Sequence, residues 1–142
     1  KKDFCGPKNS LEILVKKFLE NQKAMRELSN GRGAEHILVL QPIYELHLEA
    51  KNKIYKGEIL SPERILFRKN FTEKIMNSEF CKKNCLDFTN IFDKSYMEDL
   101  IFDKTSNEHN FEKHVFMDNV HLLDKGNQIV SKEIKNYLEN NF

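Results

Sequence analysis

The first part of the chain has a helical pattern of apolar and polar positions. From Asn9 to Leu28, apolar residues recur at steps of three and four, which is typical of a helix with one buried face. Asn9 or Ser10 can cap the start of this helix, and Gly31 can end it. The face that this spacing predicts to be buried consists of Leu11, Leu14, Val15, Phe18, Met25 and Leu28.

Two short segments have the composition of strands. Residues 36–41 include the uninterrupted apolar run 37–40, which Pro42 follows closely. Such runs are typical of strands that are buried on both faces, as in parallel sheets. Residues 86–92 are rich in aromatic and β-branched side chains and predict a second strand.

Helices are predicted before and after the second strand. Ser61, Pro62 and Glu63 mark a helix start, with Pro at the first helical position, and the apolar spacing continues to about residue 80. A last helix is predicted from about Asp124 to Tyr137, with Asp124 as its cap because Leu123 cannot cap. The polar, mixed residues 43–60 predict a long loop.

The predicted order is helix, strand, helix, strand, helix. Alternation of this kind indicates an α/β fold in which helices cover a parallel sheet with right-handed crossovers. The chain has 142 residues, enough for one core. We therefore expect residues 1–142 to form a single α/β domain without an internal boundary, or the C-terminal fragment of one, since two strands make a thin sheet.

Composition narrows the class of protein further. Hydrophobic residues make up 39% of the chain and include 11 Phe, as in globular domains. The 23 basic and 22 acidic residues are interleaved, so binding of nucleic acid through phosphate neutralisation is not expected. No apolar run approaches the roughly 20 residues of a transmembrane helix, so no transmembrane segment is expected either.

The clearest candidate chemistry lies just before the last predicted helix. Asp118 precedes His121 by three residues, on a turn that can bring the carboxylate beneath the imidazole. The carboxylate would accept the Nδ1 proton and fix the tautomer, which leaves Nε2 to act as a general base. From the spacing alone, Asp118 capping a turn beside a half-buried His121 is an equally simple interpretation.

The residues around this pair carry a resemblance. Followed by an amphipathic helix, this block resembles the last sequence block of the SGNH, or GDSL, hydrolases, and the order of elements from about residue 10 to 138 is similar to the C-terminal half of that family. The resemblance implies a three-layer α/β/α, flavodoxin-like parallel sheet. The residues that carry the resemblance are Asp118, His121, Leu122, Asp124, Gly126 and Asn127.

The resemblance also implies an activity. Asp118 would be the catalytic acid and His121 the catalytic base of an esterase that forms an acyl-enzyme on a serine. The substrate would be a small-molecule ester, such as an acylated sugar or lipid, and no cofactor is expected. However, none of the seven serines follows Gly-Asp, and the family's oxyanion glycine block and Gly-x-Asn-Asp block are absent. We therefore expect the nucleophile and oxyanion donors in an N-terminal part outside these residues.

The three cysteines suggest little catalytic chemistry. Cys81 and Cys85 are four residues apart and form either a pair of reduced thiols or a small local disulfide, which leaves Cys5 unpaired. A structural zinc would need four ligands, so no metal is expected. Three cysteines are compatible with the cytoplasm or with export.

Other polar residues have simpler explanations. Glu45 and His47 follow the first strand and either line a substrate cleft or belong to an ordinary surface loop. Glu108, His109 and His114 lie on a polar stretch and are expected to be solvated. For the chain as a whole, the alternative to a hydrolase is a non-catalytic α/β interaction or regulatory domain in which the Asp118–His121 spacing is accidental.

Overall fold

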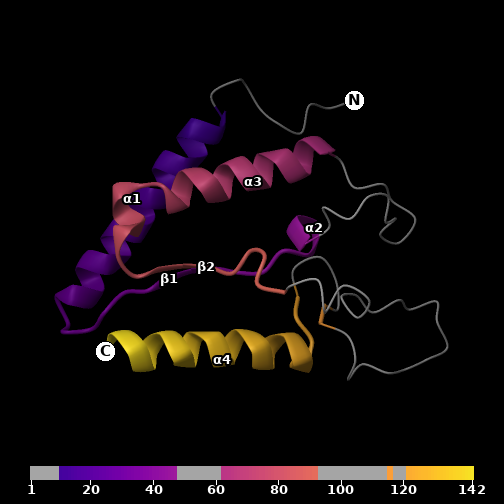
Figure 1. Cartoon of the computed structure of the whole chain (residues 1–142). Helices are drawn as coiled ribbons and strands as arrows, with labels where there is room; N and C mark the ends of the chain where they lie inside the picture. Colours follow the sequence, from indigo (N-terminus) through magenta and orange to yellow (C-terminus); the bar gives the residue numbers. More distant parts are fainter. Residues whose placement is uncertain (1–9, 48–61, 93–114, 117–120) are drawn as a thin grey trace. The chain divides into compact units, whose positions relative to one another are not determined.

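A computed structural model of the chain describes residues 10–47, 62–92, 115–116 and 121–142 (Figure 1). They form two compact units, which are described one at a time: residues 10–40 with 62–87, and residues 41–47 with 88–92, 115–116 and 121–142. The elements in chain order are α1 (Ser10–Asn30), β1 (Leu38–Leu40), α2 (Tyr44–His47), α3 (Pro62–Met76), the 3-10 helix η1 (Glu79–Lys82), β2 (Cys85–Asp87) and α4 (Asp124–Asn141).

The first unit contains a two-stranded parallel sheet. β1 pairs with β2, with Leu38 opposite Cys85 and Leu40 opposite Asp87. The predicted parallel pairing of the two strands is therefore confirmed, and the part of the chain that the structure describes is a mixed α/β fold.

The second predicted strand is less than half as long as expected. β2 ends at Asp87, and the prediction of strand over residues 88–92 is wrong. The amide of Ile91 donates to the carbonyl oxygen of Phe88 at 3.2 Å, which closes a turn over Thr89 and Asn90. Asn is common in turns because its short polar side chain tolerates their backbone angles.

α1 and α3 pack around the apolar core of the first unit. Ile75 is fully buried, and the Phe18 and Phe71 rings meet edge to face with centroids 5.4 Å apart. The predicted burial of α1 is partly wrong, since Leu14, Met25 and Leu28 are 45%, 50% and 69% exposed. The core cluster consists of Val15, Leu38, Ile75 and Phe80, with Leu11, Phe18, Leu19, Leu40, Phe71, Cys81 and Cys85 packed against it.

α3 ends earlier than the sequence pattern predicts. The Ser78 hydroxyl donates to the Ile75 carbonyl oxygen at 2.6 Å, and the Ser78 amide donates to the same oxygen at 3.1 Å. A serine that bonds a nearby carbonyl competes with continued helix. The chain therefore leaves α3 at Met76 and makes the separate 3-10 turn η1.

The second unit has its own core, to which α2 contributes. Residues 44–47 of the predicted loop form the helix α2 instead, and its Tyr44 and Leu46 side chains are buried. Residues 48–60 of the predicted loop lie outside the described part. The Phe116 ring meets the rings of Tyr44 and Phe92 edge to face, with centroids 5.6 and 5.2 Å apart. The core cluster consists of Tyr44, Phe92, Val115 and Phe116, with Ile91, Leu122, Ile129 and Val130 packed against it.

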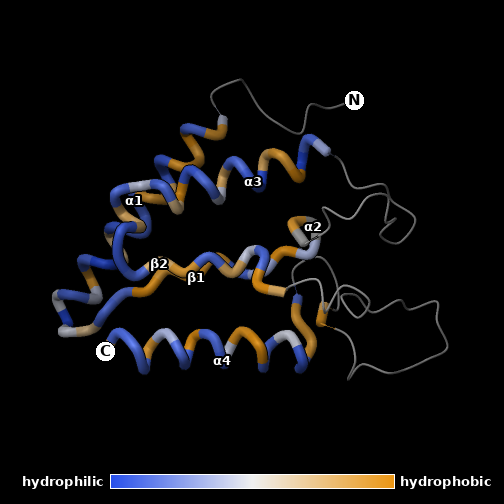
Figure 2. The backbone as a smooth tube through the Cα atoms, viewed as in Figure 1, coloured by the Kyte–Doolittle hydropathy of each residue, from blue (hydrophilic) through white to orange (hydrophobic). Residues whose placement is uncertain are grey.

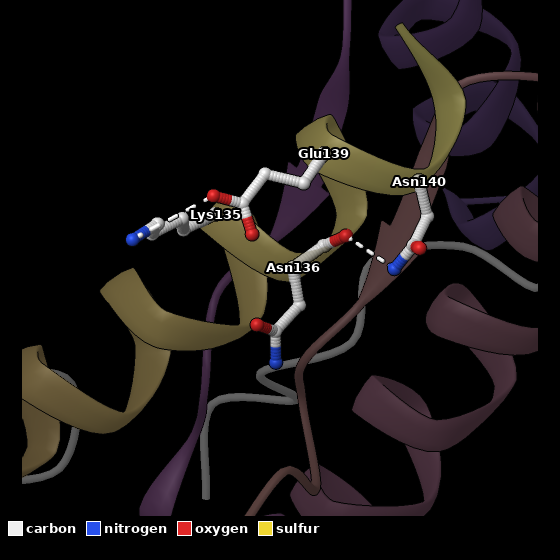
Figure 3. Close-up of polar contacts among 4 residues, drawn as sticks. All are labelled: Lys135, Asn136, Glu139 and Asn140. Atoms are coloured by element: carbon white, nitrogen blue, oxygen red, sulfur yellow. Dashed lines mark hydrogen bonds and ion pairs between the residues drawn. The ribbon is translucent and has the colours of Figure 1, made fainter.

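α4 starts at Asp124 as predicted and continues four residues past the predicted end at Tyr137. Two side chains of its last turn bond to carbonyl oxygens one turn earlier. The side-chain amide of Asn140 donates to the Asn136 carbonyl oxygen at 2.7 Å (Figure 3), and the side-chain amide of Asn141 donates to the Tyr137 carbonyl oxygen at 2.7 Å. An exposed ion pair between Lys135 Nζ and Glu139 Oε1, 3.6 Å apart, adds modestly to the stability of the helix.

Apolar and polar residues alternate along the helices (Figure 2). Among the described residues, no helix combines the length and the apolar character needed to cross a bilayer.

The packing of the first unit predicts a contrast between two isoleucines. Ile75→Ala removes a fully buried side chain and is expected to lower the free energy of unfolding by about 2–5 kcal/mol, because it leaves a cavity. Ile13→Ala is the matched control, since Ile13 is 51% exposed, and it is expected to change stability by no more than about 0.5 kcal/mol. Urea unfolding measures both values, and equal effects would contradict the described core.

Candidate functional site

His121 is an exposed residue of the second unit, three positions before α4. Its backbone position is set by its neighbours. Leu122 forms an isolated antiparallel bridge with Phe116, and the Leu123 amide donates to the Val115 carbonyl oxygen at 2.9 Å. Val115 and Phe116 are both fully buried, so the segment that carries His121 is attached to the core of this unit.

The start of α4 is held without a capping side chain. Leu123 occupies the N-cap position and makes no side-chain cap, and Asp124 is the first helical residue, so the prediction that Asp124 caps the helix is wrong. The Asn127 amide nitrogen of the backbone donates to the Leu123 carbonyl oxygen at 2.9 Å, and its side-chain amide donates to that of Leu122 at 3.4 Å. The negative charge of Asp124 also favours the positive end of the helix dipole.

Gly126 allows this close packing, a role that sequence reasoning did not assign. A Cβ atom at this position would lie 2.6 Å from the Val115 carbonyl oxygen and 3.2 Å from Cδ2 of Leu122. Real Cβ atoms do not approach a backbone oxygen so closely, so only glycine fits. The available signal was a glycine in the first turn of a helix, where it costs roughly 1 kcal/mol relative to alanine.

Asp118 lies outside the described residues, and its predicted hydrogen bond to His121 stays a prediction. Glu108, His109 and His114 also lie outside them. Glu45 and His47 fall on α2, where only the side chains of Tyr44 and Leu46 are described.

The cysteine pair and one further histidine lie in the first unit. Cys81 and Cys85 form a disulfide, which settles the choice between free thiols and a local bridge. His36, which sequence reasoning did not single out, shares a hydrogen bond between Nε2 and Oε1 of Gln22 at 3.1 Å and meets the Phe80 ring edge to face. In the described ranges, no three His, Cys, Asp or Glu side chains gather in a way that could hold a metal ion.

The first unit also has an open groove of about 480 Å³. Its lining contains neither serine nor histidine, and ion pairs join Lys74 to Glu12 at 3.4 Å and Lys16 to Glu20 at 3.8 Å. The lining residues are Glu12, Val15, Lys16, Leu19, Glu20, Lys23 and Lys74. This groove therefore offers no nucleophile or general base of the kind that the sequence suggests.

No protein-family model, curated protein or solved structure matches this chain. The candidate site therefore depends on the local geometry around His121 and on the sequence block to which it belongs.

The contact between Gly126 and Val115 can be tested directly. Gly126→Ala is expected to lower the free energy of unfolding by about 1–3 kcal/mol, because the Val115 backbone must move to admit the methyl group. Gly31→Ala is the control, since its Cβ would lie 3.4 Å from the nearest atom, and a neutral to slightly stabilising effect is expected there. Chemical denaturation compares the two variants, and a Gly126→Ala protein as stable as Gly31→Ala would refute the close contact.

Proposed function

We propose that this chain is part of a serine-ester hydrolase of the SGNH type and supplies its catalytic acid and base, Asp118 and His121. The observation that carries the proposal is the placement of His121. It is exposed, yet the residues on its C-terminal side are fixed to the buried Val115–Phe116 segment and to the start of α4. A general base needs this combination of access to substrate and a restrained position.

The proposed chemistry assigns one role to each residue. His121 Nε2 takes the proton from a serine hydroxyl as the serine oxygen attacks the ester carbonyl. The imidazolium then gives this proton to the leaving alcohol, and water hydrolyses the acyl-enzyme in a second, equivalent cycle. Asp118 accepts a hydrogen bond from Nδ1 and stabilises the imidazolium without taking the proton itself.

The two described strands pair in parallel, as the strands of such a hydrolase sheet would. We propose on this basis that the two strands belong to a larger three-layer α/β/α sheet of the flavodoxin-like kind.

The serine and the oxyanion donors belong, in this proposal, to a segment that these 142 residues do not include. The sequence lacks any Gly-Asp-Ser, and none of its serines is an alternative by motif. An acid–base pair without its nucleophile has no route to an acyl-enzyme, and without oxyanion donors it cannot stabilise the tetrahedral intermediate.

Esterase assays test this division of roles. Residues 1–142 alone are expected to hydrolyse p-nitrophenyl acetate no faster than background, whereas the protein extended at its N-terminus by its own coding sequence is expected to be active. In the extended protein, His121→Ala should reduce kcat by at least about a thousandfold, and Asp118→Ala should reduce it less. His109→Ala is the matched control and should keep full activity. An extended protein that is fully active without His121 would contradict this mechanism, and an inactive one would support the interaction-domain alternative.

The Asp118–His121 pair can also be tested in this chain without any activity. Imidazole ¹⁵N chemical shifts report which ring nitrogen carries the proton. Neutral His121 is expected to carry it on Nδ1, and Asp118→Ala should abolish this preference because the acceptor is lost. Asp124→Ala removes a carboxylate three residues on the other side of His121 and should leave the shifts unchanged. Identical shifts in the parent and in Asp118→Ala would exclude the pair.

A further inference from the structure

The disulfide of the first unit closes a loop whose shape is fixed by other contacts. Cys81 lies in η1 and Cys85 is the first residue of β2, with their Cα atoms 5.1 Å apart. This separation falls inside the usual range for a disulfide, about 4.4–6.8 Å. The contacts that hold the two backbones at this separation involve no sulfur atom.

Arg26 of α1 provides the first of these contacts. Its Nη1 donates to the carbonyl oxygen of Phe80 at 3.1 Å, and its Nη2 donates to that of Lys83 at 3.3 Å. Its Cζ also lies 3.6 Å from the centroid of the buried Phe80 ring, a cation–π contact. One guanidinium group thus joins the residue before the first cysteine to a residue between the two cysteines.

Asn84 fixes the other end of the loop. It adopts a left-handed backbone with φ of 59°, which asparagine tolerates better than most residues. Its carbonyl oxygen accepts a hydrogen bond from the Leu38 amide at 2.9 Å, and its side-chain amide donates to Oε2 of Glu35 at 3.0 Å. Cys85 follows immediately and pairs with Leu38 in the sheet.

We propose that Cys81 and Cys85 form a reversible dithiol–disulfide site that exchanges with small thiols of the glutathione class. Both cysteines are only half-buried, so a small thiol can reach them. Its thiolate attacks one sulfur, the disulfide breaks, and the other cysteine leaves as a thiolate that takes up a proton. A second small thiol displaces the first. In the net reaction, two small thiols are oxidised to their disulfide and the protein gains two thiol groups.

The preformed loop determines the position of this equilibrium. Folding raises the effective concentration of the two thiols by a certain factor. By linkage, the disulfide raises the equilibrium constant for folding by the same factor. For a closed loop of this length, with the cysteines four positions apart, the chain-entropy model gives about 30-fold. Because the contacts of Arg26 and Asn84 involve no sulfur atom, we expect the reduced protein to keep the loop and reoxidation to restore the same bond.

The experiment measures this factor in the 142-residue chain carrying Cys5→Ser, so that only one pair remains. The protein is equilibrated with mixtures of reduced and oxidised glutathione, and the fraction oxidised is read by alkylation and mass spectrometry. We expect the equilibrium constant for formation of the Cys81–Cys85 disulfide to be about 30-fold higher in native buffer than in concentrated urea. The far-ultraviolet circular dichroism spectrum should not change on reduction in native buffer. Equal constants, accumulation of glutathione adducts, or a disulfide that resists reduction until urea is added would each overturn the proposal.

Two variants test whether the sulfur-free contacts preorganise the pair. Arg26→Gln removes the charged fork and should lower the native constant about fivefold, whereas Arg32→Gln, an exposed arginine just after α1, should leave it unchanged. Asn84→Gly keeps the left-handed backbone but loses the bond to Glu35, and a decrease of about twofold is expected. It provides the measurement if Arg26→Gln does not fold. Constants equal to the parent in the folded Arg26 or Asn84 variants would refute preorganisation.

Discussion

The parallel pairing of β1 with β2 constrains the path of the chain between them, because parallel strands cannot be joined by a tight turn. The connection must return to the end of the sheet where β1 began, and α3 is its longest described element. A ladder of three residues per strand is also too short to be stable in water by itself. Burial of Ile75 and Val15 against the strands supplies the missing stability, so the sheet depends on its helices.

The second unit is held together by contacts of its own. Ile43, three residues after β1, donates its amide to the carbonyl oxygen of Thr89, two residues after β2, at 3.3 Å. Tyr44, the residue after Ile43, and Phe92, three residues after Thr89, both meet Phe116 in one aromatic cluster. Phe116 in turn bridges Leu122. A continuous series of contacts within this unit therefore connects residues 43–44 and 89–92 to the residue beside His121.

The sequence predicted the elements better than their ends. The start of α4, the parallel strands and the helical character of α1 and α3 follow from periodicity and from apolar runs, which act over many residues. The early end of α3 depends on one hydroxyl, that of Ser78, and the end of β2 depends on one turn at Thr89–Asn90. Single hydrogen bonds of this kind are weak signals in a sequence, because serine and asparagine also occur at many surface positions where they end no element.

Prediction of the candidate site from the sequence had the same limit. The Asp118–His121 spacing selected this segment as a candidate, but spacing does not show what holds His121 in place. That task is shared by groups without chemical reactivity of their own: the Val115 carbonyl oxygen, the bridge from Phe116 and the missing Cβ of Gly126. Backbone atoms and an absent side chain leave little trace in a residue pattern. For the same reason the two kinds of residue separate experimentally. Gly126 is buried and is expected to affect folding, whereas His121 is exposed, so its substitution tests the proposed chemistry in a folded protein.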